Sequence, residues 1–277
     1  MKSLNRVLPL AAVLAFIAAA SALSAEQAPW RRIDDGLHLV AFDAPQKSTA
    51  GDSKITVLKI DPKNYALKLL SASENGNRTL TAKQWCEQHK LVAAINAGMY
   101  QADGVTHVAY LRNFAHVNNP RQTKDKAFIA FNRTSATVPE IQIIDTQYQD
   151  LPAMSAQYNT LIQNIRAVCA KRENVWTQQP RTWSIALLGM DENGNVLFLF
   201  TRSPYSMHDF VDMLLALPIS LHNAAYLEGG PPATLYLSAN GVEMELVGSY
   251  ETGVFETDSN RRAWPLPNVI GVVRRGK

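Results

Sequence analysis

The sequence predicts a single α+β domain with a mixed, largely antiparallel central sheet flanked by a few helices. Many short apolar segments with strand composition, separated by turn residues, indicate the sheet. Only a few segments have the length and the capping residues of helices. No linker rich in Pro, Gly or Ser divides the 277 residues, and 47% hydrophobic residues suffice for one large core.

The body of the chain begins with strands. Residues 55–60 (ITVLKI) and 65–70 (YALKLL) have strand composition, and the turn sequence DPKN joins them, which predicts an antiparallel hairpin. A short buried run follows at 91–95. Two further strands are predicted at 127–131 and 140–145.

Two segments are predicted to be helices. Residues 79–90 form the first, with Thr79 or Thr81 as the N-cap. Residues 206–217 form the second, because Ser206 begins a sequence that resembles a capping box and a proline follows the segment.

The remaining elements are one ambiguous segment and several strands. Residues 155–170 fit the apolar spacing of a helix, but a strand is equally compatible with their composition. Residues 183–200 (WSIALLGMD and NVLFLF, joined by ENG) predict a second hairpin. Strand-like segments follow at 224–230 and 233–241, and a final strand is predicted at 268–273.

The N-terminal segment has the layout of a secretory signal peptide. Lys2 and Arg6 precede an uncharged apolar run of 14 residues, Val7 to Ala20, which small residues follow. The run is shorter than the ~20 residues of a spanning helix, although an uncleaved membrane anchor is the alternative. We therefore expect residues 1–25 to be a cleaved signal peptide, 26–277 to be the domain, and the protein to be periplasmic or secreted without a stable membrane anchor.

The charge balance argues against nucleic acid as a partner. The whole chain carries a net charge of +3, and loss of Lys2 and Arg6 with the signal peptide would reduce it to +1. The rest of the sequence contains no long basic run, whereas binding to nucleic acid needs a clustered basic patch.

The cysteines and histidines predict neither a metal nor a cofactor site. Cys86 and Cys169 could form a disulfide after export, or each could be a buried free thiol. None of the six histidines is spaced from another as metal ligands on one element would be. The sequence also contains no P-loop and no G-x-G-x-x-G segment.

Two short segments place residues suited to chemistry at the end of a strand. In AINAGMY, Asn96 ends an apolar strand beside Gly98 and could turn its amide into a cleft, and an ordinary Asn/Gly turn is the alternative. In AYLEGG, Glu228 follows a strand of buried type and precedes Gly229 and Gly230. Such a carboxylate could orient a ligand or take part in catalysis. The alternative is that it only caps the turn.

In this order, the two segments resemble the phosphodiester glycosidase family. A WS-x-A-x-x-G-x-D hairpin lies between them and PNVIGVV follows, so the resemblance spans about 50–275. It implies an exported glycoside hydrolase, without a cofactor, that cleaves the sugar C1–O–phosphate bond of a glycosyl phosphodiester. The implied partner is a glycosyl-phosphate small molecule or an envelope glycan.

The resemblance also implies the site residues. The family motif N-G-G-[MF]-[FY] is matched from Asn96 to Tyr100, and L-D-G-G is matched with Glu228 in place of the aspartate. Glu228 and Asn96 are implied as catalytic, because a carboxylate can stabilise an oxocarbenium-like centre. Arginine binds phosphate through its planar fork. The implied substrate-binding residues are Arg112, Arg166, Arg181, Gln163, Gly98, Tyr100, Gly229 and Gly230.

The sequence departs from the family pattern at several positions. Ile185 stands where an arginine is frequent, and Ala109 stands where glycine is usual. Pro231 and Pro232 replace small residues after the second motif. These departures favour an alternative function, a catalytically impaired envelope protein of the same fold that binds a glycan or a phosphosugar.

Overall fold

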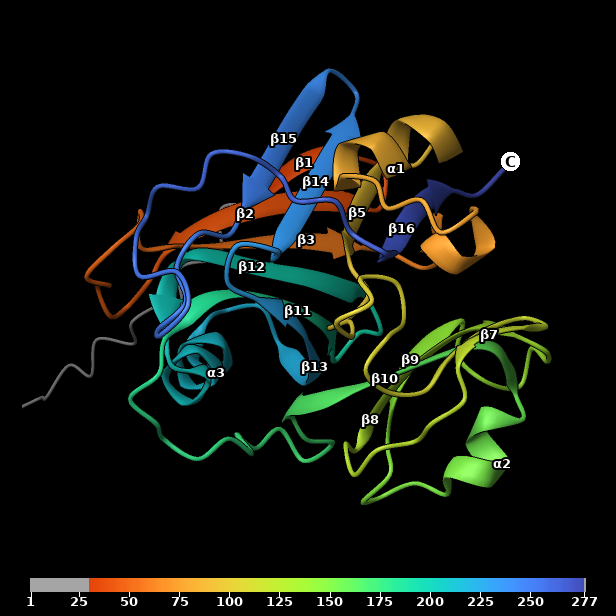
Figure 1. Ribbon diagram of the computed structural model, residues 1–277. Helices are drawn as coiled ribbons and strands as arrows, with labels where there is room; N and C mark the ends of the chain where they lie inside the picture. Colours follow the sequence, from red (N-terminus) through yellow and green to blue (C-terminus); the bar gives the residue numbers. More distant parts are fainter. Residues whose placement is uncertain (1–29, 277) are drawn as a thin grey trace, which may run out of the picture.

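Two packed β-sheets and three α-helices make up the part of the chain that the structure describes (Figure 1). The computed structural model describes residues 30–276. One sheet has 11 strands and the other has 5. Every ladder between described strands is antiparallel. The α+β fold with a largely antiparallel sheet is therefore confirmed.

The strand order differs from the sequence order in both sheets. The larger sheet consists, in spatial order, of β1 (Arg31–Asp34), β2 (Leu37–Asp43), β3 (Lys54–Ile60), β12 (Val196–Tyr205), β11 (Trp183–Asp191), β13 (Leu221–Gly229), β10 (Tyr158–Val168), β6 (Leu111–Asn113) and β7 (His116–Asn119), with β8 (Ala127–Arg133) beside β10 and β9 (Ile141–Asp145) beside β8. The smaller sheet consists of β15 (Val242–Val247), β14 (Thr234–Ala239), β5 (Ala93–Asn96), β16 (Asn268–Arg274) and β4 (Tyr65–Ser71). The helices are α1 (Ala82–His89), α2 (Leu151–Ser155) and α3 (Met207–Ala216).

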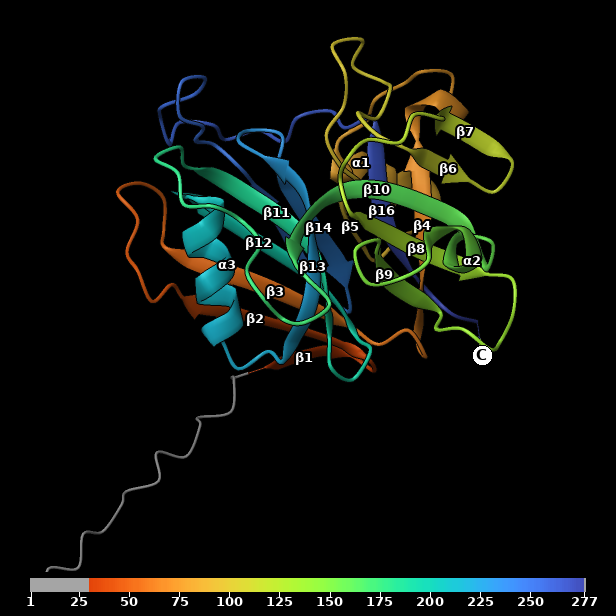
Figure 2. The ribbon, with the colours of Figure 1, turned by 90° about the horizontal axis from the view of Figure 1, so that it is seen from below.

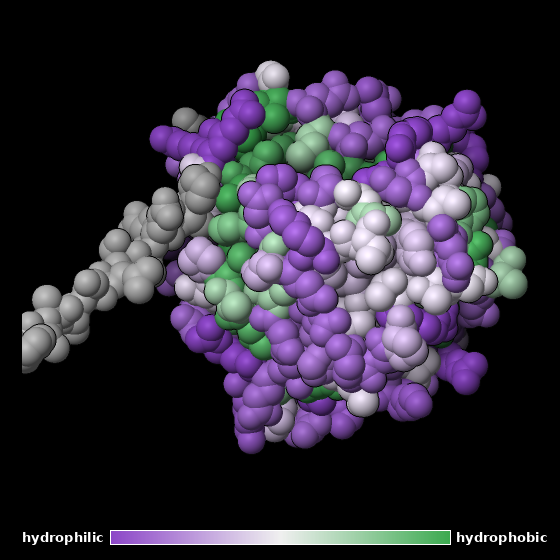
Figure 3. Space-filling model, turned by 90° about the vertical axis from the view of Figure 1, so that its left-hand side faces the viewer, coloured by the Kyte–Doolittle hydropathy of each residue, from purple (hydrophilic) through white to green (hydrophobic). Residues whose placement is uncertain are grey.

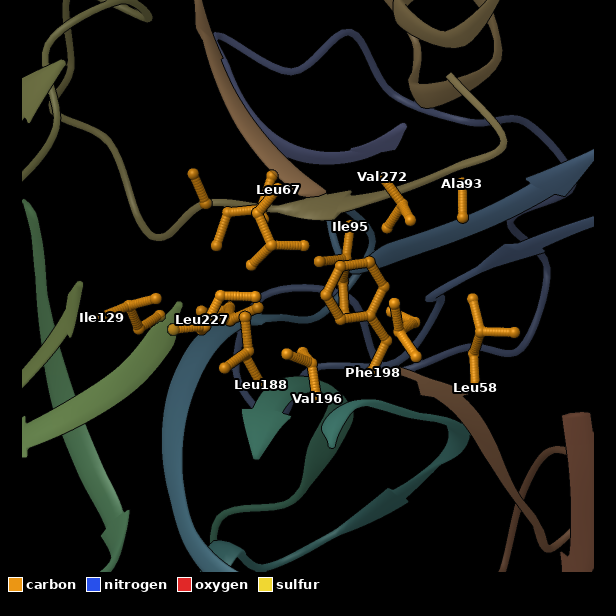
Figure 4. Close-up of a cluster of buried hydrophobic side chains, with 14 of the residues drawn as sticks. Leu58, Leu67, Ala93, Ile95, Ile129, Leu188, Val196, Phe198, Leu227 and Val272 are labelled. Carbon is orange, nitrogen blue, oxygen red and sulfur yellow. The ribbon is translucent and has the colours of Figure 1, made fainter. Parts of the chain in front are cut away.

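The main hydrophobic core lies between the two sheets (Figure 4). Leu58, Leu188 and Phe198 project into it from the larger sheet. Leu67 and Ile95 meet them from the smaller sheet. Removal of this apolar surface from water is the main force that holds the two sheets together.

Helix α3 covers part of the opposite face of the larger sheet (Figure 2). Phe210 and Leu214 on the helix are fully buried with Ile185 and Leu187 of β11. Strand β11 is thus buried on both faces, which explains why its sequence is apolar almost throughout rather than alternating. The predicted hairpin 183–200 and the predicted helix 206–217 are both confirmed.

Helix α1 packs on the outer face of the smaller sheet through Trp85 and Cys86. Its N-cap is Thr81, not Thr79, because the Thr81 side chain accepts a hydrogen bond from the backbone N–H of Gln84 in a full capping box. Cys86 and Cys169 are both buried free thiols. Of the two alternatives for these cysteines, the structure therefore shows the unpaired one.

The predicted hairpin of 55–60 with 65–70 is wrong, although both strands exist. Strand β3 pairs with β2 and β12 in the larger sheet, whereas β4 pairs with β16 in the smaller sheet. Asp61 closes the turn between them, and its carbonyl accepts from the backbone N–H of Tyr65 at 3.0 Å. The same turn residues serve a hairpin and a crossing between sheets, so the local sequence did not distinguish the two.

The ambiguous segment 155–170 is mainly strand β10, which the short helix α2 precedes. Five strands were not predicted from the sequence, because they have few fully buried residues: β1, β2, β6, β7 and β15. Polar residues cover most of the face shown in Figure 3, and hydrophobic residues show between them in separate places.

The predicted signal peptide, residues 1–25, lies outside the described residues. None of the helices within residues 30–276 has the length and apolar character that crossing a bilayer requires.

Candidate active site

A pocket of about 310 Å³ lies at the end of β13, where Glu228 faces a cluster of polar and aromatic side chains. Its polar members are Glu228, Glu251, Arg181 and Gln179. Its aromatic members are Trp176, Trp183 and Tyr226, and Met99, Ile165 and Gly229 complete the wall. We call this space the Glu228 pocket. It combines two carboxyl groups and a guanidinium with an aromatic surface.

The carboxyl group of Glu228 is held in an environment that disfavours its charge. The residue is only 8% exposed. Burial raises its pKa to about 8, the backbone N–H of Gly229 (3.0 Å from Oε1) partly opposes this shift, and the negative charge of Glu251 raises the pKa further. Glu228 is therefore mainly protonated at neutral pH, and it can donate a hydrogen bond or a proton.

Glu251 is the second carboxylate of the pocket, and it lies 3.6 Å from the guanidinium of Arg181. A tight turn fixes it, because the backbone groups of Glu251 and Phe255 exchange hydrogen bonds of 2.8 Å. Glu251 was not predicted from the sequence. It stands in an irregular segment without strand or helix periodicity, so no local pattern marked it.

Trp176 lies at the centre of the aromatic surface. Its ring centroid is 5.8 Å from that of Tyr226 and 6.5 Å from that of Trp183. The indole N–H donates to the carbonyl of Arg166 at 3.0 Å, which fixes the ring. Aromatic faces of this kind can pack against the apolar C–H face of a sugar ring.

Close contacts leave no room for a side chain at either of the two glycines after Glu228. A Cβ atom on Gly229 would lie 2.4 Å from Cδ1 of Trp183 and 2.4 Å from the hydroxyl of Tyr226. Gly230 has a φ of +66°, and a Cβ there would lie 2.6 Å from a carboxylate oxygen of Glu251. Gly229 thus lines the pocket, and Gly230 lets Glu251 approach the backbone.

Asn96 forms hydrogen bonds with backbone groups and does not line the Glu228 pocket. Its amide nitrogen donates to the carbonyl of Pro232 at 3.0 Å, and its amide oxygen accepts from the backbone N–H of Thr234 at 2.7 Å. It is 1% exposed. We therefore describe Asn96 as a positioning residue, in contrast to the catalytic role that the resemblance implied.

Because Gly98 has no side chain, His107 and Asn164 can pack closely against its backbone. Gly98 has a φ of +150°, and a Cβ atom would lie 2.3 Å from Nε2 of His107 and 2.4 Å from Oδ1 of Asn164. Burial lowers the pKa of His107 to about 4, so its ring is neutral. Burial, and then the negative charge of Glu228, raise the pKa of Tyr100.

Three implied substrate-binding residues have other partners. The guanidinium of Arg112 donates to the carbonyl of Tyr158 at 2.5 Å. Arg166 binds both carboxylate oxygens of Asp145, at 2.8 and 2.9 Å. Gln163 is 1% exposed. Its amide oxygen accepts from a backbone N–H, and its amide nitrogen donates to two backbone carbonyls. Of the four implied substrate-binding side chains Arg112, Gln163, Arg166 and Arg181, only Arg181 lines the Glu228 pocket.

The departures from the family pattern have local explanations. Ile185 is fully buried in β11 and pairs with Gly229, and Arg181 supplies the guanidinium at the pocket instead. Ala109 is buried, and its backbone N–H donates to Nδ1 of His107 at 3.1 Å. The carbonyl of Pro232 accepts the hydrogen bond from Asn96.

A second hollow of about 380 Å³ lies at the start of β13, beside His222. Its carboxylates are already paired. Asp191 accepts hydrogen bonds from both the backbone and the side chain of Asn195 at 2.8 Å, and Glu192 lies 2.5 Å from Arg172. Although this hollow is larger, the Glu228 pocket is the better candidate for catalysis, because among the described residues Glu228 accepts a hydrogen bond only from the backbone N–H of Gly229.

Comparisons with known proteins agree with the resemblance seen in the sequence. The family model for phosphodiester glycosidase matches residues 89–273. The catalytic domain of zebrafish N-acetylglucosamine-1-phosphodiester α-N-acetylglucosaminidase, auto-inhibited by its pro-peptide, aligns with a TM-score of 0.63 at 14% identity, over 90% of this chain and 87% of that one. A hypothetical protein from Synechocystis aligns with a TM-score of 0.57 at 14% identity, over 87% and 62%. A search of curated proteins finds no match.

Proposed function

The chain belongs to the phosphodiester glycosidase family, and from this premise we propose that it hydrolyses a glycosyl phosphodiester between the sugar C1 atom and the phosphate oxygen. Water adds to C1, which gives the free sugar and a phosphate monoester. The observation that carries this proposal is the Glu228 pocket, where the buried carboxyl group of Glu228, the guanidinium of Arg181 and an aromatic surface line one space. These groups match an anionic substrate with a sugar ring.

The charges of the pocket suit a phosphodiester. A diester carries one negative charge, so two ionised carboxylates would repel it. Protonation of Glu228 removes one of these charges, and the guanidinium of Arg181 offers a partner for the phosphate oxygens. The pocket can therefore accept an anion although it contains two glutamates.

We assign different roles to the two glutamates. Glu228 donates a hydrogen bond, and finally a proton, to the oxygen that leaves with the phosphate. Glu251 provides the negative charge that stabilises the oxocarbenium-like centre and orients the attacking water. Such a division follows the general pattern in which one carboxyl group acts as an acid and a second as a carboxylate. It also changes the role of Glu228 from a stabilising carboxylate to an acid.

The substitution Glu228→Gln tests this assignment. It preserves the size of the side chain but removes the proton, so we expect release of free sugar to fall by about 10²- to 10⁴-fold. The substrate would be a panel of hexose-1-phosphodiesters, and the exposed Glu87→Gln is the matched control. Unchanged turnover in Glu228→Gln would contradict the role of Glu228. Tight binding of a diester without any turnover in the parent protein would favour the alternative function, a binding protein of the same fold.

The site of action forms part of the proposal. The signal-peptide layout of residues 1–25 supports export, either to the periplasm or out of the cell. Envelope glycopolymers with sugar phosphodiester links are accessible to an exported enzyme, and they are the substrates we propose. Detection of the protein in extracellular or periplasmic fractions with residues 1–25 removed would test this point.

A further inference from the structure

A second space lies at the opposite end of strand β13 from Glu228. This hollow of about 380 Å³ is lined by His222 and Asn223 at the start of β13, and we call it the His222 hollow. His222 precedes Glu228 by six residues, which an extended strand spans in about 20 Å. No described residue lines both this hollow and the Glu228 pocket. The proposed hydrolysis therefore leaves the His222 hollow without a role.

The hollow lies where the larger sheet divides. Strand β13 pairs with β10 and β11, whereas among the described strands β9 pairs only with β8. A space is left between β9 and the start of β13, and residues from both sides line the hollow. A long hydrogen bond of 3.4 Å, from Nδ2 of Asn223 to the carbonyl of Ile143, crosses this space. Because paired strands form these walls, the sheet fixes the shape of the hollow.

Asn223 carries a buried acceptor that no described residue satisfies. The residue is 6% exposed, and its Oδ1 atom has no hydrogen-bond partner within residues 30–276. A buried polar atom without a partner destabilises a fold, whereas a leucine of similar size would avoid this cost. The amide is explained by a hydrogen-bond donor on a ligand that enters the hollow.

The free edge of β9 adds further polar groups to the hollow. In an antiparallel pair, every second residue directs its backbone N–H and C=O away from the partner strand. The carbonyl of Ile143 points away from β8 in this way, because it accepts from Asn223, and Ile141 has the same parity. Gln142 and His222 add a half-buried amide and a half-buried imidazole. The hollow can therefore both donate hydrogen bonds to a ligand and accept them.

The charges around the hollow favour a neutral ligand. Asp191 accepts three hydrogen bonds, from the backbone N–H groups of Asn193 and Asn195 and from the side chain of Asn195, at 2.8–2.9 Å. Glu192 forms an ion pair with Arg172. No lysine or arginine is among the described residues that line the hollow, so an anion would find no cationic partner. A cation would find both carboxylates already engaged.

An apolar wall faces these polar groups. The side chains of Ile141, Ile143 and Met190 line the hollow and are each less than 7% exposed, and Pro139 stands exposed at its edge. Small-molecule sites commonly combine such an apolar wall with a few polar groups that orient the ligand. A sugar ring has hydroxyl groups at its rim and apolar C–H groups on its face, so it matches both surfaces.

We propose that the His222 hollow is a second carbohydrate site, which binds a neutral hexose unit about 20 Å from Glu228. A hydroxyl group of the sugar donates to Oδ1 of Asn223, and the ring packs against Met190. This binding does not depend on the proposed hydrolysis. Its consequence for the enzyme is that a glycan held at this site stays near the Glu228 pocket, which raises its effective concentration there.

Titration of the full chain with the methyl glycosides of glucose, galactose and N-acetylglucosamine, followed by ligand-observed NMR, tests the proposal. We expect at least one of them to bind with a Kd of about 1 mM or lower. Asn223→Leu and His222→Ala should each weaken this binding by about tenfold or more. The matched controls are Asn159→Leu and His38→Ala, at half-buried strand positions away from the hollow, and both should bind as the parent does.

Urea unfolding of Asn223→Leu distinguishes a ligand contact from a structural role. The substitution keeps the size of the side chain and removes an oxygen without a partner, so the unfolding midpoint should not fall. Turnover of a hexose-1-phosphodiester should stay within about twofold of the parent value, because Asn223 lies outside the Glu228 pocket. If Asn223→Leu does not fold, the titration of His222→Ala decides the proposal by itself.

Three results would overturn the second carbohydrate site. The first is that none of the three methyl glycosides binds at concentrations up to about 10 mM. The second is binding that persists unchanged in both Asn223→Leu and His222→Ala, since the sugar would then occupy another site. The third is binding of glucosamine or glucose 6-phosphate about tenfold tighter than methyl glucoside, which would mark a site for a charged ligand. Loss of turnover in the parent protein bears only on the proposed function.

Discussion

At the scale of the residue, the central feature is the conflict between the burial of Glu228 and its charge. The pKa is raised from 4.5 to about 8, so the folded protein binds a proton that the unfolded chain releases above pH 4.5. Below pH 4.5 both states are protonated and the burial of Glu228 carries no charge penalty. As the pH rises to about 8, this penalty grows to its full value, on the order of 5 kcal/mol from the size of the shift.

Glu228→Gln is therefore expected to stabilise the fold in a pH-dependent way. Glutamine resembles the protonated acid, so the variant should unfold at nearly the parent urea concentration at about pH 4 and at a clearly higher one at about pH 9. Glu87→Gln, on the exposed face of α1, should show no such trend. A stability difference that does not change with pH would mean that Glu228 has an ordinary pKa.

The catalytic step should depend on the same ionisation, which lowers the rate as it lowers the stability. Sugar release needs protonated Glu228, so the rate should be steady below about pH 7 and fall as the pH passes the pKa of about 8. A pH–rate profile of kcat/KM for one hexose-1-phosphodiester measures this. A rate that rises through pH 8 would show that Glu228 acts as a base.

At the scale of the element, the site lies where the chain crosses from one sheet to the other. Strand β13 belongs to the larger sheet and β14 to the smaller, and Gly229 to Ala233 make the crossing. Asn96 at the end of β5 ties this crossing to the smaller sheet through the backbone of Pro232 and Thr234. The two segments singled out in the sequence are therefore neighbours because one binds the backbone of the other.

Asn96→Ala is expected to loosen this crossing. It removes two hydrogen bonds and leaves a carbonyl and an N–H without their partner, so the free energy of unfolding should fall by about 1–3 kcal/mol, with a parallel loss of activity. Urea unfolding and sugar release measure the two effects. Asn193→Ala, in the exposed turn between β11 and β12, is the control. A loss of activity without any loss of stability would restore Asn96 as a catalytic residue.

The elements also show which features the sequence could predict. The hairpin β11–β12 and helix α3 were predictable, because long apolar runs with clear turns and caps specify them locally. The partner of β3 was not, because a turn at Asp61 fits a crossing as well as a hairpin. Sheet pairing depends on packing between distant segments, which the local sequence does not contain.

At the scale of the whole molecule, the Glu228 pocket gathers residues that lie far apart in the chain, from Met99 to Glu251. Motif resemblance indicated Glu228 and Gly229, and both line this pocket at the end of β13. It assigned Gln163 and Arg166 to the same function, but both side chains of strand β10 are committed elsewhere. Glu251 and Trp176 were missed, because only the assembled sheets bring their irregular segments to the end of β13.

The central claim is that the protein cleaves the bond between the sugar C1 atom and the phosphate oxygen. Hydrolysis of a hexose-1-phosphodiester in heavy-oxygen water, followed by mass spectrometry of both products, tests it most directly. We expect the heavy oxygen on C1 of the released sugar and none in the phosphate monoester. Glu228→Gln should greatly slow the formation of both products. Heavy oxygen in the phosphate monoester would show cleavage at phosphorus and would contradict the account.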